Sequence, residues 1–183
     1  MDRKEALQKI HEHVSKESLI DHMIATEAIM RGLAKKLGQD EEKWALTGLL
    51  HDIDYEQTAD DPASHSLVGA EMLEKMGLDE EVTHAVKVHN EMHGIPRESL
   101  LDKALYAADP LSGLITAVAM VMPSKKLEDV KVSSIKKKFK DKAFARGASR
   151  EQIKSCEELG LTLDEFFEIA LEEMKKSAGD LGL

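Results

Sequence analysis

Residues 48–56 read GLLHDIDYE, and this stretch indicates how the chain folds. Leu49 and Leu50 complete the apolar face of a helix that the sequence predicts over about residues 40–52. His51 and Asp52 follow at the C-terminal end of that helix. An imidazole or a carboxylate among apolar neighbours is costly unless it is paired or metal-bound. We therefore expect both side chains to serve a site in the interior of a helical protein.

The segments on either side repeat their apolar residues with the 3.6-residue period of an α-helix. Ser18 and Asp21 form a capping-box pattern at the start of one such helix, and Gly38 ends it. Pro62 is predicted to start another helix, which ends at Gly77. The further predicted helices cover residues 2–13, 79–90, 98–122, 149–159 and 163–177. The sequence predicts a single all-α domain over residues 1–183.

Two features modify this simple pattern. Pro110 lies inside the apolar segment 98–122, and a proline in a helix interior costs about 3 kcal/mol. We therefore expect a kink or a break of that helix at Asp109. The acidic stretch from Asp54 to Asp61 has the composition of a solvated loop.

Composition excludes several classes of protein. A chain of 183 residues is long enough to bury a core of its own. Its net charge of −10 at pH 7 argues against a general polyanion-binding surface, and so against a nucleic-acid partner. The single cysteine, Cys156, allows no intrachain disulfide and no cysteine-based zinc cluster, which favours a cytoplasmic setting. No apolar stretch approaches ~18 residues and the N-terminus does not resemble a signal peptide, so no membrane partner is expected.

Six polar residues lie on or at the ends of helices that otherwise face the core, among apolar neighbours. They are His22, His51, Asp52, His65, His89 and Asp109. Such residues, when they converge from different helices, are how a helical bundle builds a metal site. Imidazole and carboxylate donors without thiolate suit iron, manganese, zinc, nickel or cobalt. The sequence predicts a site for one or two divalent transition metals, at which Asp52 is placed to bridge.

The segment 125–146 reverses the charge of the chain, with nine basic residues and three acidic ones. Five of its lysines are candidates for a wall that binds substrate phosphates. They are Lys125, Lys126, Lys136, Lys137 and Lys140. The alternatives are a solvated helix face and a nucleic-acid patch.

The order His22, His51-Asp52 and Asp109 resembles the H…HD…D signature of the HD-domain metal-dependent phosphohydrolases. The extra histidines lie in HSLVGAEML, which starts at His65, and in AVKVHNE, which contains His89. The segment LLDKALYAADPLSG then supplies Asp109. GLLHDIDYE resembles the HDIG form of the motif, although Asp54 replaces the glycine. The resemblance covers about residues 19–120 and implies an HD-domain helical bundle, with a basic and helical C-terminal extension over about residues 125–180.

The resemblance also implies a division of labour among the six residues. His22, His51, Asp52 and Asp109 would surround one metal, and His65 and His89 would join Asp52 around a second. The alternative roles of these two histidines are support of the metal ligands and contact with substrate. Two such metals hold the attacking and leaving oxygens of a phosphoryl displacement and activate water. The implied enzyme is a hydrolase of a phosphoric ester or anhydride, with His51 and Asp52 as its catalytic residues.

The implied substrate is a nucleotide or another small phosphorylated metabolite. Two other functions remain open on the same scaffold. The first is an HD-type di-iron oxygenase, because a histidine-rich ligand set permits oxygen activation. The second is a non-catalytic, metal-stabilised protein that binds a nucleotide or RNA through the lysine segment. The sequence also allows a homodimer.

Overall fold

The computed structural model describes residues 1–183, and all of its regular elements are helical. The α-helices are α1 (Arg3–His13), α2 (Glu17–Leu37), α3 (Glu41–Leu50), α4 (Tyr55–Thr58), α5 (Leu67–Lys75), α6 (Glu80–His89), α7 (Leu100–Met120), α8 (Val132–Lys140), α9 (Arg150–Lys154), α10 (Leu163–Lys176) and α11 (Ala178–Leu181). Short 3₁₀ turns form η1 (Glu91–His93), η2 (Leu127–Asp129) and η3 (Ser155–Leu159). The predicted all-α fold is confirmed. None of these helices combines the length and the apolarity needed to cross a membrane.

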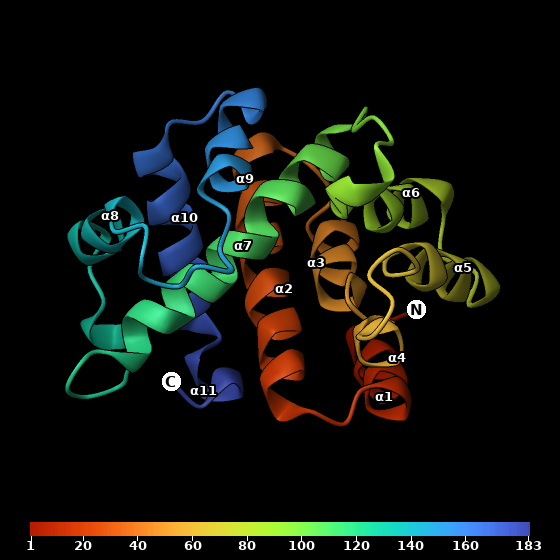
Figure 1. Ribbon diagram of the computed structural model, residues 1–183, viewed down its shortest axis with the longest axis horizontal. Helices are drawn as coiled ribbons and strands as arrows, with labels where there is room; N and C mark the ends of the chain where they lie inside the picture. Colours follow the sequence, from red (N-terminus) through yellow and green to blue (C-terminus); the bar gives the residue numbers. More distant parts are fainter.

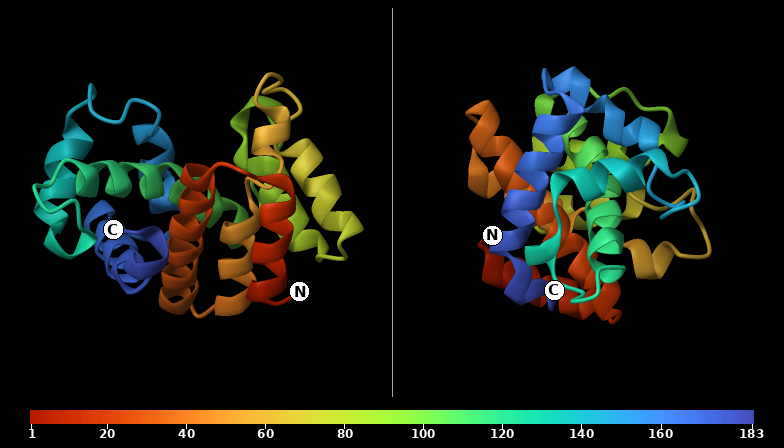
Figure 2. Two further views of the ribbon diagram at one scale, coloured as in Figure 1. Left: turned by 90° about the horizontal axis from the view of Figure 1, so that it is seen from below. Right: turned by 90° about the vertical axis from the view of Figure 1, so that its left-hand side faces the viewer.

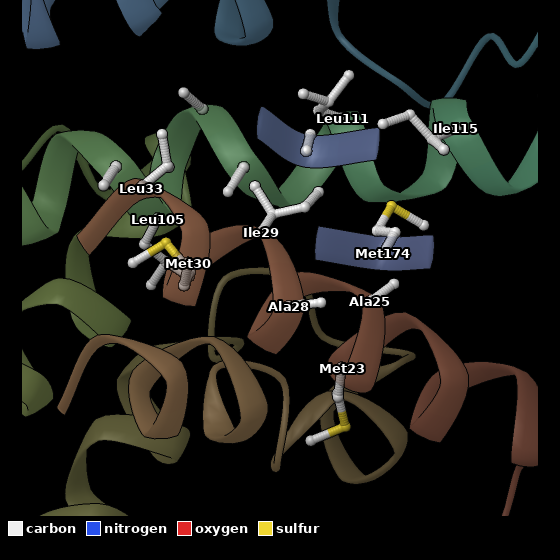
Figure 3. Close-up of a cluster of buried hydrophobic side chains, with 14 of the residues drawn as sticks. Met23, Ala25, Ala28, Ile29, Met30, Leu33, Leu105, Leu111, Ile115 and Met174 are labelled. Carbon is white, nitrogen blue, oxygen red and sulfur yellow. The ribbon is translucent and has the colours of Figure 1, made fainter. Parts of the chain in front are cut away.

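Helices α2 and α7 form the centre of the molecule (Figure 1). Helix α3 packs along α2, and α6 packs on α7 with α5 outside it. The C-terminal helices α8, α9 and α10 cover the other side, and the views in Figure 2 separate this group from the α5–α6 pair. Figure 3 shows how the core is filled: Ile29 and Leu33 of α2 lie in one buried cluster with Leu105 and Leu111 of α7. The site residues therefore come from helices that share one core.

Helices α2 and α3 approach each other closely at Gly48. A Cβ atom there would lie 2.8 Å from the backbone oxygen of Thr26, 2.9 Å from Met30 Cγ and 3.0 Å from the backbone nitrogen of Glu27. Two of these neighbours are backbone atoms, which a rotamer change cannot move. The absence of a side chain at Gly48 thus sets the spacing of the two helices.

We expect Gly48→Ala to lower the free energy of unfolding by about 2–3 kcal/mol, because the extra methyl overpacks a helix contact. Urea denaturation measures this change. The matched control is Gly113→Ala in α7, where a Cβ atom would meet no heavy atom within 4 Å. That control is expected to stabilise by about 1 kcal/mol through helix propensity. Equal stabilities for the two variants would contradict the close approach.

Several helix starts follow the local sequence and one does not. Asp40, Asp79 and Thr162 each accept a backbone N–H as the N-cap of the helix that follows, within a residue of the predicted helix starts. The capping box predicted at Ser18 is wrong, because α2 already begins at Glu17. No side chain caps α2. The Glu56 carboxylate holds the chain just before the helix, accepting from the backbone N–H groups of residues 15 and 16 at 2.7 and 3.3 Å.

Of the kink or break predicted at Asp109, the break is wrong, because α7 runs without interruption from Leu100 to Met120 and includes Pro110. The side chains of Leu111, Leu114 and Ile115 after the proline are fully buried. Burial of one such side chain is worth about 1.5–3 kcal/mol, so together they outweigh the cost of about 3 kcal/mol for the proline. The continuous helix carries Asp109 to the interior.

Candidate metal centre

The structure brings all six candidate residues to one place. His22 lies on α2, His51 and Asp52 directly follow α3, and His89 ends α6. His65 lies two residues before α5, and Asp109 lies in the middle of α7. The side chains of His51, Asp52 and His89 are buried, whereas the other three are partly exposed.

Asp52 lies at the centre of this cluster. Its Oδ1 atom is 3.5 Å from His51 Nε2 and 3.4 Å from the Nε2 atoms of both His65 and His89. Its Oδ2 atom is 3.5 Å from His22 Nε2. A transition metal sits about 2 Å from each nitrogen or oxygen ligand, so two ligands of one ion lie about 3–4 Å apart. The spacing around Asp52 fits that requirement for all four imidazoles.

Asp109 completes one side of the cluster. Its Oδ1 atom lies 3.1 Å from His22 Nε2 and 3.8 Å from His51 Nε2. His22, His51 and Asp109 form one group of mutually close donor atoms, and His51, Asp52 and His89 form a second. His51 belongs to both groups, so the geometry allows one ion in each of two adjacent positions.

Backbone carbonyls orient the two most deeply buried imidazoles. His51 Nδ1 lies 2.8 Å from the carbonyl oxygen of Gly48, and His89 Nδ1 lies 2.6 Å from that of Val86. Since a carbonyl only accepts, each Nδ1 must carry the proton in the neutral imidazole. Each Nε2 then presents a lone pair to Asp52. The Nε2 atom of His51 is buried and has no hydrogen-bond partner, which is the situation a metal ion would resolve.

Side chains orient the other two imidazoles. Ser112 Oγ donates to the carbonyl oxygen of Asp109 at 2.8 Å, so it accepts from His22 Nδ1 at 2.9 Å. His65 Nδ1 lies 3.1 Å from Asp54 Oδ1, where it donates to a carboxylate. All four histidines therefore turn Nε2 toward the centre and use Nδ1 for support, as metal-ligating histidines commonly do.

The role of Asp54 differs from the sequence expectation. The residue is fully buried rather than in a solvated loop. Besides His65, its carboxylate accepts the backbone N–H groups of Ser66 and Gly69, at 2.8 and 2.9 Å. A Cβ atom at Gly69 would lie 3.0 Å from Asp54 Oδ1, so the missing side chain admits the carboxylate. These contacts hold the segment before α5, which starts at Leu67 rather than at the predicted Pro62.

A sequence profile of the HD domain matches residues 19–114, which include His22, His51, Asp52 and Asp109. This chain belongs to the HD-domain family. The match spans more than half of the chain and coincides with helices α2 to α7, which supply the six candidate donors. The predicted family and the predicted HD-domain bundle are confirmed.

Curated relatives share more than the HD domain with this chain. Ribonuclease Y of Oleidesulfovibrio alaskensis is 30% identical over 138 residues, which cover 74% of this chain and 26% of that protein. Ribonuclease Y of Lawsonia intracellularis is 31% identical over 138 residues with the same coverage. Ribonuclease Y of Thermosipho melanesiensis is 31% identical over 146 residues, 74% of this chain and 27% of that protein. The HD-domain chain thus spans about a quarter of the length of these relatives. No solved structure gives a significant match.

These names overturn the expectation that nucleic acid is not a partner. That expectation rested on the net charge of the whole chain, which sums acidic residues from every surface. The potential at one site depends on the charges within about a Debye length of it, which is ~10 Å at 0.1 M salt. Total charge therefore does not decide what an HD-domain site binds.

The electrostatics of the HD-domain centre favour bound cations. Burial by itself lowers the pKa of His51, but the negative charges of Asp52 and Asp109 act in the opposite direction and raise it to about 9. Burial raises the pKa of Asp52, yet the neighbouring imidazoles, His51 first among them, hold it well below the usual range. The two carboxylates thus stay ionised and draw positive charge to the histidines, as protons or as metal.

Metal binding by the HD domain is therefore expected to strengthen with pH. Below its pKa of about 9, His51 holds a proton in the metal-free protein, and a metal must displace it. Each displaced proton changes the metal affinity by roughly tenfold per pH unit below that pKa. Chelator-competition titrations between about pH 6 and pH 9 measure the slope. An affinity for metal that does not vary with pH would contradict this account of His51.

A cavity of about 290 Å³ opens in front of the HD-domain donors. His22 and Asp109 form part of its wall, and its other lining residues are Pro110, Gly113, Ala145, Gly147 and Ala148. The five lysines of the predicted phosphate wall are Lys125, Lys126, Lys136, Lys137 and Lys140, and none of them lines this cavity.

The packing of α8 explains where these lysines lie. Ile135 is buried and Phe139 packs edge-on against Phe167 of α10, at 5.4 Å between ring centroids. The apolar side of α8 therefore faces the core. Lys136 is 2.7 Å from Asp164 of α10, and Lys125 lies in an exposed turn. The loop after α8, rather than α8 itself, reaches the cavity.

Proposed function

We propose that this HD-domain protein is a metal-dependent phosphohydrolase that cleaves phosphodiester bonds of RNA. The observation that carries the proposal is the orientation of four imidazoles, each with Nδ1 supported and Nε2 turned toward Asp52. The names of the curated relatives support RNA rather than a small phosphorylated metabolite as the substrate.

In this proposal His22, His51 and Asp109 hold one divalent metal, and His65 and His89 hold a second. Asp52 is shared between them, because its two oxygens face all four histidines within 3.5 Å. Metals bound there would polarise a phosphate oxygen and lower the pKa of water to near neutral. The donor set favours iron, manganese, zinc, nickel or cobalt over calcium.

The chain's own residues supply the rigidity that such a site needs. The Gly48 and Val86 carbonyls are parts of helices, so the imidazoles of His51 and His89 cannot rotate without losing a buried hydrogen bond. Asp109 is exposed enough to meet a substrate in the cavity of about 290 Å³, whereas Asp52 lies behind it and is nearly inaccessible. The opening of the site is therefore on the His22–Asp109 side.

The experiment is elemental analysis of protein purified without chelator, followed by cleavage of end-labelled RNA. We expect two metals per chain, and RNA cleavage that a chelator abolishes and the same metal restores. Turnover of small phosphomonoesters without RNA cleavage would overturn the substrate proposed here. Oxygen consumption by the iron-loaded protein without any hydrolysis would favour the oxygenase alternative instead.

A further inference from the structure

The loop of residues 141–149 joins α8 to α9 and crosses α7 next to the metal centre (Figure 1). Ala145, Gly147 and Ala148 of this loop form one wall of the cavity that His22 and Asp109 line from the other side. A group bound in the cavity would therefore touch this loop and the proposed metal ligands at once.

A single arginine holds the loop in place. The guanidinium of Arg150 donates hydrogen bonds of 2.6–3.2 Å to six backbone carbonyls. The acceptors are the carbonyl oxygens of Lys138, Phe139, Asp141, Phe144, Ala145 and Ala148. The first two belong to the last turn of α8, and the other four belong to the loop.

Lysine is a poor substitute for this arginine. The guanidinium has five N–H donors in a rigid, planar fork, whereas an ammonium has three donors on one atom. Here Nε reaches one carbonyl, Nη1 two and Nη2 three, so all five N–H groups are used and one N–H of Nη2 is shared between two carbonyls. Arg150 forms no ion pair with a carboxylate, and its guanidinium is satisfied by these carbonyl oxygens instead.

The loop offers an anion further groups. The backbone N–H groups of Ala145, Arg146 and Gly147 have no acceptor within the chain. The Arg146 side chain is exposed, and residues 142–149 contain no acidic residue. Ala145 has a positive φ of 45°, a strained conformation that the Arg150 hydrogen bonds to this loop keep in place. The loop lines the same cavity as His22 and Asp109 of the metal centre. An anionic substrate in that cavity would therefore meet the loop as one of its walls.

We propose that Arg150 is a positioning residue that holds the 141–149 loop as a phosphate-binding wall for the substrate. The ligand is a phosphate group of the substrate, held between the loop and the metal centre. The inference rests on the proposed function for the identity of the substrate. In place of the predicted lysine wall it puts the loop at Ala145, Gly147 and Ala148, which lines the cavity and is held by Arg150. The exposed side chain of Arg146 lies between two of these lining residues in the sequence.

The test compares Arg150→Lys with the control Arg31→Lys, whose arginine pairs with Glu42 on the surface. Trypsin cleavage after Lys142 and Arg146 reports the order of the loop without any need for activity. We expect Arg150→Lys to be cleaved at least about tenfold faster than the control, because cleavage of a locally opened segment follows its open population. Metal content should stay at the wild-type value, since Arg150 contacts none of the six donors. Unchanged proteolysis would overturn the role of Arg150.

The kinetics of RNA cleavage then separate a role of Arg150 in positioning the loop for substrate from a role in the stability of the protein alone. We expect Arg150→Lys to raise KM for RNA about tenfold with kcat changed by less than about threefold, because the wall binds rather than reacts. Arg146→Gln should raise KM for RNA in the same direction with no change in Tm, because its side chain is exposed. An unchanged KM in both variants would show that the loop does not contact the substrate.

A second probe separates this inference from the proposed function. Inorganic phosphate, added to metal-loaded protein, should slow trypsin cleavage of the wild-type loop and have no effect in Arg150→Lys. Protection by phosphate in a protein that cleaves no RNA would retain the wall and reject RNA as the substrate. RNA cleavage without protection by phosphate, and with wild-type KM in both variants, would reject the wall and retain the proposed function.

Discussion

Asp52→Asn is expected to empty the metal centre and to abolish hydrolysis while the helices remain folded. The two oxygens of Asp52 face four Nε2 atoms, so this one carboxylate serves both proposed metal positions. Asparagine keeps the volume but removes the negative charge, and its amide N–H groups would occupy the Nε2 lone pairs. We expect metal affinity to fall by more than about a hundredfold and turnover by about a thousandfold or more.

The matched control is Asp60→Asn, which makes the same chemical change in the exposed stretch a few residues later. Metal per chain after gel filtration measures the first effect, and circular dichroism checks that helix content is retained. RNA cleavage measures the second effect. An Asp52→Asn protein that retains both metals and full turnover would remove Asp52 from the centre.

Local sequence chemistry was sufficient to place most of the helices. Asp40, Asp79 and Thr162 cap the helices that follow them because an N-cap hydrogen bond spans only three residues. The start of α2 could not be predicted in this way, because no side chain caps it and the chain before it is held by Glu56, about forty residues away. The same limit applies to Pro110, whose helix is kept continuous by apolar packing against distant parts of the chain.

The candidate donors could be predicted because polar residues on apolar helix faces are rare and costly. The carboxylate that supports His65 could not be predicted, since Asp54 begins a stretch of acidic residues whose composition is that of a solvated loop. Its burial depends on the N–H groups of Ser66 and Gly69, which only the folded chain brings there. Charge counting likewise pointed to lysines on α8 and to Lys125 and Lys126 before it. None of these lines the cavity, whereas the loop that Arg150 holds does.

Two substitutions of Asp54 are expected to have large effects: the alanine variant tests its role in folding, and the asparagine variant tests its role in metal binding. Asp54→Ala leaves three donors without an acceptor: the partly exposed His65 Nδ1 and the buried N–H groups of Ser66 and Gly69. Each unsatisfied buried donor costs about 1–3 kcal/mol. We expect the free energy of unfolding to fall by about 3–5 kcal/mol, measured by urea denaturation of the metal-free protein. A loss below about 1 kcal/mol would contradict the buried role of this carboxylate.

Asp54→Asn is the sharper experiment. The amide oxygen can still accept from Ser66 and Gly69, so the loss of stability should be smaller, about 1–2 kcal/mol. The amide nitrogen then faces His65 Nδ1 and donates to it, which moves the imidazole proton to Nε2. An Nε2 that carries a proton cannot bind metal, whereas His51 and His89 keep their tautomer through backbone carbonyls.

The expected result of Asp54→Asn is therefore selective. The metal position that uses His65 should weaken by about 10–100-fold, and the position formed by His22, His51 and Asp109 should retain its metal. Elemental analysis after dialysis would then give one metal per chain instead of two. Loss of both metals together would show that the two positions cannot be occupied independently. Retention of both would show that His65 is not a ligand and that Asp54 serves the fold alone.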